Sequence, residues 1–80
     1  MKNIAMRKRA EWLVNTSVQD MQSGLWQYTT QDDLDLLRLA YVIVRRRREA
    51  TKCKVLASKI RKLDASLRSA ELIKKEIYHE

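Results

Sequence analysis

Apolar residues recur along this chain at steps of three and four positions, the spacing that places side chains on one face of an α-helix. Two such series are present, formed by Leu34, Leu37, Tyr41 and Val44 and by Leu56, Ile60, Leu63 and Leu67. The sequence has one glycine and no proline, and helix-forming residues dominate. It therefore predicts an all-α protein with one domain over residues 1–80: a helical hairpin or small bundle of two to three helices, the last one long.

Three helical segments are predicted, at residues 3–23, 31–50 and 52–78, with a connector at 24–30. The first has a loose apolar face, made of Ile4, Ala5, Trp12, Leu13, Val18 and Met21. Gly24, the only glycine, follows it and suits the left-handed position that often closes a helix.

The start of the second segment has a capping signal. Thr30 is a suitable N-cap residue, and Asp33 stands three positions later, where a capping-box partner belongs. Together with Asp32 and Asp35, it places negative charge at the positive end of the helix.

The relation between the second and third segments is open, because neither glycine nor proline separates them. One continuous helix of about 48 residues is the alternative to a break. Val44 and Leu56 are twelve residues apart, or about 1,200° of helical rotation, so the two apolar series would lie about 120° apart on a continuous helix. We therefore expect a bend or a change of packing partner at residues 47–52.

The size of the chain favours self-association. A protein of 80 residues buries only about 60–65% of its unfolded surface, and small proteins often complete their core by oligomerising. The segment 36–44 is apolar on nearly all sides, which indicates neighbours on several faces, either its own helices or a second subunit. We expect a dimer or higher oligomer that uses the two apolar series, through Leu37, Tyr41, Val44, Leu56, Ile60, Leu63 and Leu67.

Positive charge is concentrated in one part of the chain. The net charge is +7, and residues 45–63 alone hold nine basic side chains and one acidic one, a sum of +8. This basic face either contacts a partner, through residues such as Arg46, Arg47 and Arg48, or is the solvated side of a packed helix. A nucleic acid and an acidic protein surface are both compatible partners. A helix-turn-helix is disfavoured, because no short glycine turn is present and the second segment opens with three aspartates that would repel phosphate.

Catalytic and metal-binding chemistry is not indicated. The single cysteine and single histidine, Cys53 and His79, cannot make a disulfide framework or a four-ligand metal site. No serine has a histidine base nearby in sequence, and no glycine-rich phosphate loop is present. We expect no enzyme activity, no cofactor and no small-molecule ligand. The longest apolar run, 36–44, is far shorter than the roughly 20 residues of a membrane span, so we expect a cytoplasmic protein without a membrane contact.

Aromatic residues are the strongest candidates for a protein contact, because large aromatics supply much of the energy at interfaces. Trp12, Trp26 and Tyr28 are therefore assigned to partner binding. Tyr41 is a further candidate. The alternative is that these aromatic residues complete a core that lacks phenylalanine; we favour it for Tyr41 and leave it open for Trp26 and Tyr28.

In general character the chain resembles the small, basic, helical accessory proteins of bacteriophages and prophages, antirepressors among them. The features that carry the resemblance are its length, its single cysteine and the apolar segment "LLRLAYVIV" that precedes a charged helix. The resemblance implies stoichiometric binding to another protein, such as a repressor or other transcription regulator, whose activity is altered. The alternatives are a DNA-binding protein that uses the basic face Arg45–Lys62 and a structural helix of a larger assembly.

Overall fold

Four α-helices, and no strand, are formed by the residues that the structure describes, 2–23 and 27–78 of this computed structural model. Side chains are described at 4–23 and 27–73. The helices are α1 (Lys2–Val14), α2 (Val18–Gln22), α3 (Gln31–Arg46) and α4 (Ala50–Tyr78). The prediction of an all-α protein with a long C-terminal helix is confirmed. Gly24 and Trp26 lie outside the described residues.

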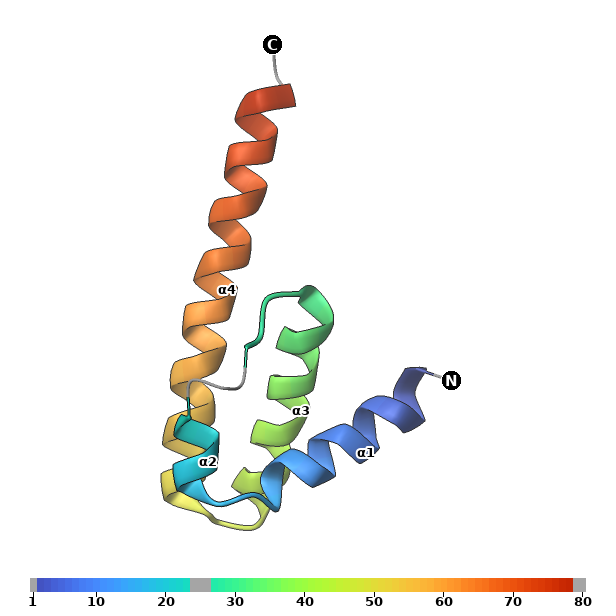
Figure 1. Cartoon of the computed structure of the whole chain (residues 1–80), viewed down its shortest axis with the longest axis vertical. Coiled ribbons are helices and arrows are strands. Elements are labelled where there is room, and N and C mark those ends of the chain that lie inside the picture. Colours follow the sequence, from blue (N-terminus) through green and yellow to red (C-terminus); the bar gives the residue numbers. More distant parts are fainter. Residues whose placement is uncertain (1, 24–26, 79–80) are drawn as a thin grey trace.

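Helix α3 lies between α1 and α4, and α2 lies against the first half of α4 (Figure 1). The radius of gyration is 14.3 Å, larger than the roughly 12 Å expected for a compact chain of this length. The difference comes from α4, whose C-terminal part continues beyond the other helices (Figure 1). The C-terminal part of α4 therefore projects from the packed part of the bundle (Figure 1).

The core forms where these helices meet, and α3 supplies half of its residues because it packs against both α1 and α4. Its members are Ala10, Leu13, Val14, Leu34, Leu36, Leu37, Ala40, Val44, Leu56 and Leu63. Met21 of α2 is also fully buried. Cys53, a free thiol, is half-buried beside this core. The expectation that segment 36–44 would have neighbours on several faces is met by helices of the same chain.

The first predicted helix, 3–23, is wrong as a single element, because the structure breaks it after Val14. Thr16 donates its hydroxyl to the Leu13 carbonyl over 2.6 Å, and the Ser17 hydroxyl caps α2 by accepting from the Asp20 amide. Short polar side chains that bond to nearby backbone in this way compete with the helix.

The break also changes which face of α1 is buried. The predicted apolar face included Ile4 and Trp12, yet these are 60% and 63% exposed. Ala10, Leu13 and Val14 are buried instead. Because α1 ends at Val14 and α2 is a separate helix, Trp12 does not share a helix face with Val18 and Met21.

The predicted capping box at the start of α3 is present. Thr30 accepts a 3.1 Å hydrogen bond on its hydroxyl from the Asp33 amide. The Asp33 carboxylate accepts in return from the amides of Thr30, at 3.0 Å, and Thr29, at 2.8 Å. Three backbone donors at the helix entrance are thereby satisfied.

The predicted break between α3 and α4 is also present, but α3 ends at Arg46 rather than near residue 50. The Glu49 amide donates to the Val44 carbonyl and the Arg48 amide to the Arg45 carbonyl, both over 3.1 Å. This is the hydrogen-bond pattern of a Schellman motif, whose left-handed position is usually glycine. Here Arg48 occupies it, with φ of 58°. The chain therefore reverses direction without a glycine, and the apolar residues of α4 pack against α3.

Candidate protein-binding surface

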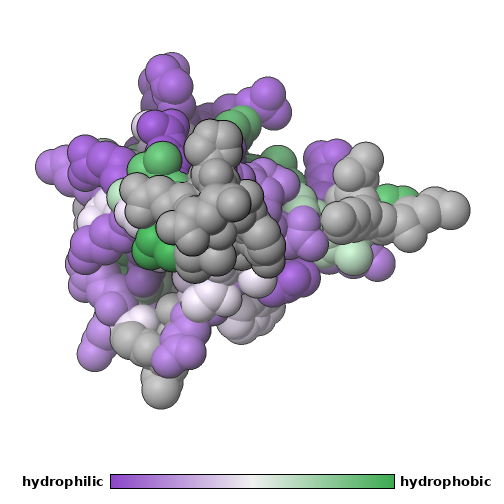
Figure 2. Space-filling model, turned by 90° about the horizontal axis from the view of Figure 1, so that it is seen from above, coloured by the Kyte–Doolittle hydropathy of each residue, from purple (hydrophilic) through white to green (hydrophobic). Residues whose placement is uncertain are grey.

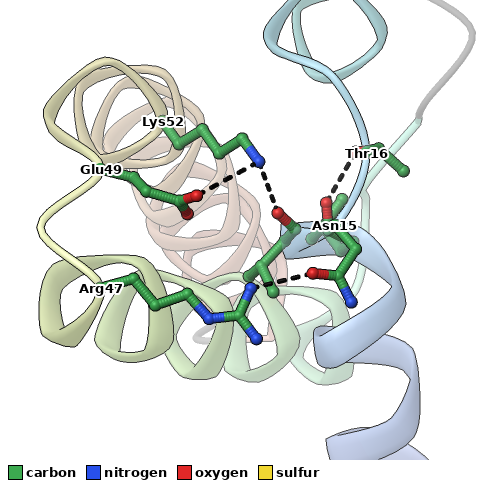
Figure 3. Close-up of polar contacts among 7 residues, drawn as sticks. Asn15, Thr16, Arg47, Glu49 and Lys52 are labelled. Atoms are coloured by element: carbon green, nitrogen blue, oxygen red, sulfur yellow. Dashed lines mark hydrogen bonds and ion pairs between the residues drawn. The ribbon is translucent and has the colours of Figure 1, made fainter.

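Helix α1 packs on α3 through its buried residues, and polar contacts also join its C-terminal end to the turn between α3 and α4 (Figure 3). Lys52 donates from Nζ to the Val14 carbonyl over 2.7 Å. Arg47 donates from Nη1 to the Asn15 side-chain oxygen over 2.9 Å. A cation at the carbonyl end of a helix satisfies an orphan acceptor and opposes the negative end of the helix dipole. We call these contacts the α1 clasp.

Glu49 completes the clasp from the turn itself. Its Oε1 lies 3.7 Å from Lys52 Nζ, so the ammonium group is shared between a carbonyl and a carboxylate (Figure 3). The other oxygen, Oε2, is buried without a hydrogen-bond partner among the described residues. Burial of an oxygen without a hydrogen bond destabilises the folded state. The ion pair between Glu49 and Lys52 offsets part of this cost.

With α1 fixed in this way, Trp12 and Tyr28 line the same hollow although they are sixteen residues apart in sequence. The hollow has a volume of about 250 Å³ and lies between α1, α3 and the connector. Its lining consists of Lys8, Arg9, Trp12, Leu13, Tyr28 and Leu36. We call it the α1 hollow. Its walls are aromatic and aliphatic, and its two charged residues are both cations.

Tyr28 is the half-buried member of this site. Partial burial raises the pKa of its phenol, the Asp33 carboxylate raises it further, and Arg9 opposes both. The phenol is therefore neutral at physiological pH, and the side chain combines a hydroxyl group with an aromatic ring. This combination of an apolar body and a polar tip is typical of binding hot spots.

A second groove lies on another side of α1, where that helix meets the end of α3. It has a volume of about 460 Å³ and is lined by Arg7, Glu11, Leu39, Val42, Ile43, Arg46 and Arg47. Val42 is 42% exposed there. The second groove therefore combines apolar residues of α3 with charged residues of both signs, unlike the α1 hollow.

The three arginines assigned to partner binding have different roles in the structure. All three are exposed. Arg46 and Arg47 both line the second groove. Arg47 is also engaged in the α1 clasp, and Arg48 forms the turn. Trp26 lies outside the described residues. The structure thus brings Trp12 and Tyr28 together and separates them from Arg46 and Arg47.

The residues assigned to self-association lie mainly inside the single chain. Leu37, Val44 and Leu56 have no exposed surface, and Leu63 is 6% exposed. The half-buried residues Tyr41, Ile60 and Leu67 pack against the same core. The two apolar series meet each other across α3 and α4, so most of their surface is already covered without a second copy.

Several residues of the site were missed by sequence reasoning. Lys8, Arg9 and Leu36 line the α1 hollow, and Asn15 and Lys52 hold α1 in place. The pairing of Ser17 with Asp20 three positions later was a readable N-cap signal that would have located the end of α1. The contact between Lys52 and Val14 has no local signal, since 38 residues separate the two.

Comparisons with known proteins give no further indication of function. No protein-family model matches the chain, nor does any curated protein or solved structure. Among the described residues, no group of three or more histidine, cysteine, aspartate or glutamate side chains is placed to hold a metal ion. No helix in that part of the chain has the length and apolar character required to cross a bilayer.

Proposed function

We propose that this chain is a non-enzymatic regulatory protein that binds another protein stoichiometrically and alters its activity. The observation that carries the proposal is the α1 hollow, in which Trp12 and Tyr28 form an apolar depression beside Lys8 and Arg9. Trp12 keeps 63% of its surface exposed, although burial of a tryptophan is strongly favourable. A hollow of this kind fits a bulky apolar side chain of a partner.

The charge around the hollow suggests the chemistry of that partner. Lys8 and Arg9 are both exposed, and no carboxylate lines the hollow among the described residues. Complementary charge guides a partner into place and raises its association rate. The proposed partner surface is therefore acidic around an apolar anchor. A repressor or other transcription regulator is the class of partner that the antirepressor-like character of the chain suggests.

The proposal includes self-association, but through a different surface from the buried series. Leu72 and Ile73, on the projecting part of α4, are 61% and 57% exposed. Seen along α4 from its C-terminal end, the surface is mostly hydrophilic, and hydrophobic side chains emerge close to this helix (Figure 2). Pairing of two projecting helices would cover these residues without disturbing the core.

Capture of partners from the native host, followed by calorimetry with each purified candidate, tests the protein-binding proposal. Trp12→Ala is expected to weaken binding by about 30-fold, the effect of losing a hot-spot residue worth about 2 kcal/mol. Ile4→Ala is the matched control, because Ile4 is on the same helix and is 60% exposed but does not line the hollow. Equal affinity of wild type, Trp12→Ala and Tyr28→Ala for every partner would refute this use of the hollow.

A further inference from the structure

The basic side chains fall into two groups when their partners are compared. Five are engaged within the chain: Arg7 with Glu11, Arg38 and Arg68 with Asp64, Arg47 with Asn15, and Lys52 with Glu49 and Val14. Within the basic face Arg45–Lys62, Arg47 and Lys52 are the residues engaged in this way, and the other basic side chains of the face form no ion pair with a carboxylate of the described residues. Lys54, Lys59 and Lys62 are distinguished from the remaining cations of the face by their position in hollows of the surface.

These three lysines line two hollows along α4. The hollows, of about 260 and 320 Å³, share Lys59 and Lys62 in their linings. Lys54 lines the larger one, beside Gln22 of α2, and Tyr28 lines the other. We call the two hollows together the lysine groove. Its length from Lys54 to Lys62 is about 12 Å at 1.5 Å per residue.

The lining of the lysine groove has the composition of an anion site. Besides the lysines it offers the hydroxyl groups of Ser58, Ser66 and Thr29 as hydrogen-bond donors. No aspartate or glutamate of the described residues is part of the lining. Lys59 is half-buried, and Lys54 and Lys62 are exposed, so the lining places three positive charges along this part of α4.

The shape of the groove favours a flexible anionic strand over a folded surface. Lysines spaced along a groove contact successive phosphates, and hydroxyl groups donate to phosphate and sugar oxygens. Tyr28 supplies an aromatic ring at one end, the feature on which an unpaired base stacks. Reading of a duplex would require a helix that enters the major groove, whereas α4 is packed against α2 and α3 and the start of α3 carries Asp32 and Asp33.

We propose that the lysine groove binds single-stranded nucleic acid, with Lys54, Lys59 and Lys62 on successive phosphates and with no dependence on base sequence. This activity is separate from protein binding at the α1 hollow, although Tyr28 lines both sites. The chain would thus hold a protein on one side and a nucleic-acid strand on another.

The test is fluorescence anisotropy with a labelled single strand of random sequence and with the matching duplex, at 50 and 200 mM salt. The groove variant is Lys54→Gln/Lys59→Gln/Lys62→Gln. The control variant, Arg38→Gln/Arg45→Gln/Arg61→Gln, removes the same charge from exposed positions that line neither hollow of the groove. Circular dichroism establishes that both variants keep the helical content of the wild type.

Three phosphate contacts to a single strand give a salt slope of about −2.1, so a fourfold rise in salt weakens binding about 20-fold through these contacts alone. We expect that loss in the wild type and in the control variant. For the groove variant, the dissociation constant at 200 mM salt divided by the one at 50 mM should be about 20-fold smaller than for the wild type. Equal weakening in both variants would show that net charge, and not the groove, attracts the strand. Tighter binding of the duplex, or no binding at 50 mM salt, would also overturn the proposal.

Discussion

Arg48 has the least favourable backbone conformation in the described chain, since its φ of 58° lies in the left-handed region, where a Cβ atom is crowded. Arg48→Gly should therefore stabilise the protein, by up to about 1 kcal/mol after allowance for the entropy of the unfolded glycine. Arg45→Gly, inside the last turn of α3, should destabilise it by about 0.5–1 kcal/mol. Urea denaturation measures both. Destabilisation by Arg48→Gly would mean that the turn differs from a Schellman motif.

Lys52 makes two contacts of the α1 clasp, one with the Val14 carbonyl and one with Glu49. Lys52→Met keeps the apolar stem but removes the hydrogen bond to Val14 and leaves Glu49 without its cation. The expected loss in free energy of unfolding is about 1.5–3 kcal/mol, the range for hydrogen bonds of charged groups. Lys54→Met, which removes an exposed lysine, should change stability by less than about 0.5 kcal/mol. Equal effects of the two substitutions in denaturation experiments would contradict this role of the clasp.

Residue-scale features were predictable only where they are local. Thr30 and Asp33 could be recognised as a capping box because the motif is contained within four positions. The left-handed Arg48 could not be recognised, because glycine normally marks that position. The meeting of Trp12 with Tyr28 depends on how α1 packs on α3, and no pattern in either segment specifies that packing.

At the scale of the helix, Asp33 links the start of α3 to pH. Burial tends to raise the pKa of its carboxyl, but the hydrogen bonds from Thr29 and Thr30, together with Arg9, outweigh burial and lower that pKa below its ordinary value of 3.8. On acidification the unfolded chain therefore takes up a proton at Asp33 before the folded chain does, which favours unfolding. The stabilisation is present above the unfolded pKa and is lost as pH falls through the folded one.

Denaturation of the wild type and of Asp33→Asn, in steps from pH 7 to pH 2, measures this contribution. We expect Asp33→Asn to be less stable at pH 7, because it loses the charge at the helix N-terminus. The stability difference between the two proteins should shrink as pH falls below 4. A constant difference across the range would show that the Asp33 carboxylate does not contribute to the capping of α3.

The elements themselves were predicted unevenly, for a physical reason. The change in direction of the apolar series between Val44 and Leu56 correctly indicated a break, since a continuous helix could not bury both. The prediction of one helix over 3–23 was wrong because Asn15, Thr16 and Ser17 interrupt it. Their side chains bond to nearby backbone or to Arg47. Local capping overrides a weak apolar periodicity.

At the scale of the whole molecule, the projecting part of α4 determines the expected oligomeric state. Sedimentation over a range of concentrations should show self-association of the wild type. Leu72→Gln/Ile73→Gln should shift the equilibrium toward monomer, because it removes the exposed apolar surface at the end of α4. Val42→Gln, on α3, is the control and should leave the equilibrium unchanged. A wild-type protein that is monomeric at every concentration would contradict this prediction.

Photo-crosslinking in the native host tests whether the α1 hollow binds a partner protein. The crosslinker p-benzoylphenylalanine is placed at position 8, which lines the hollow and leaves Trp12 intact, or at position 4, an exposed site on the same helix that does not line it. We expect a discrete adduct with one protein from position 8, and much less of it from position 4. No adduct from position 8, or the same set of adducts from both positions, would contradict binding at the hollow.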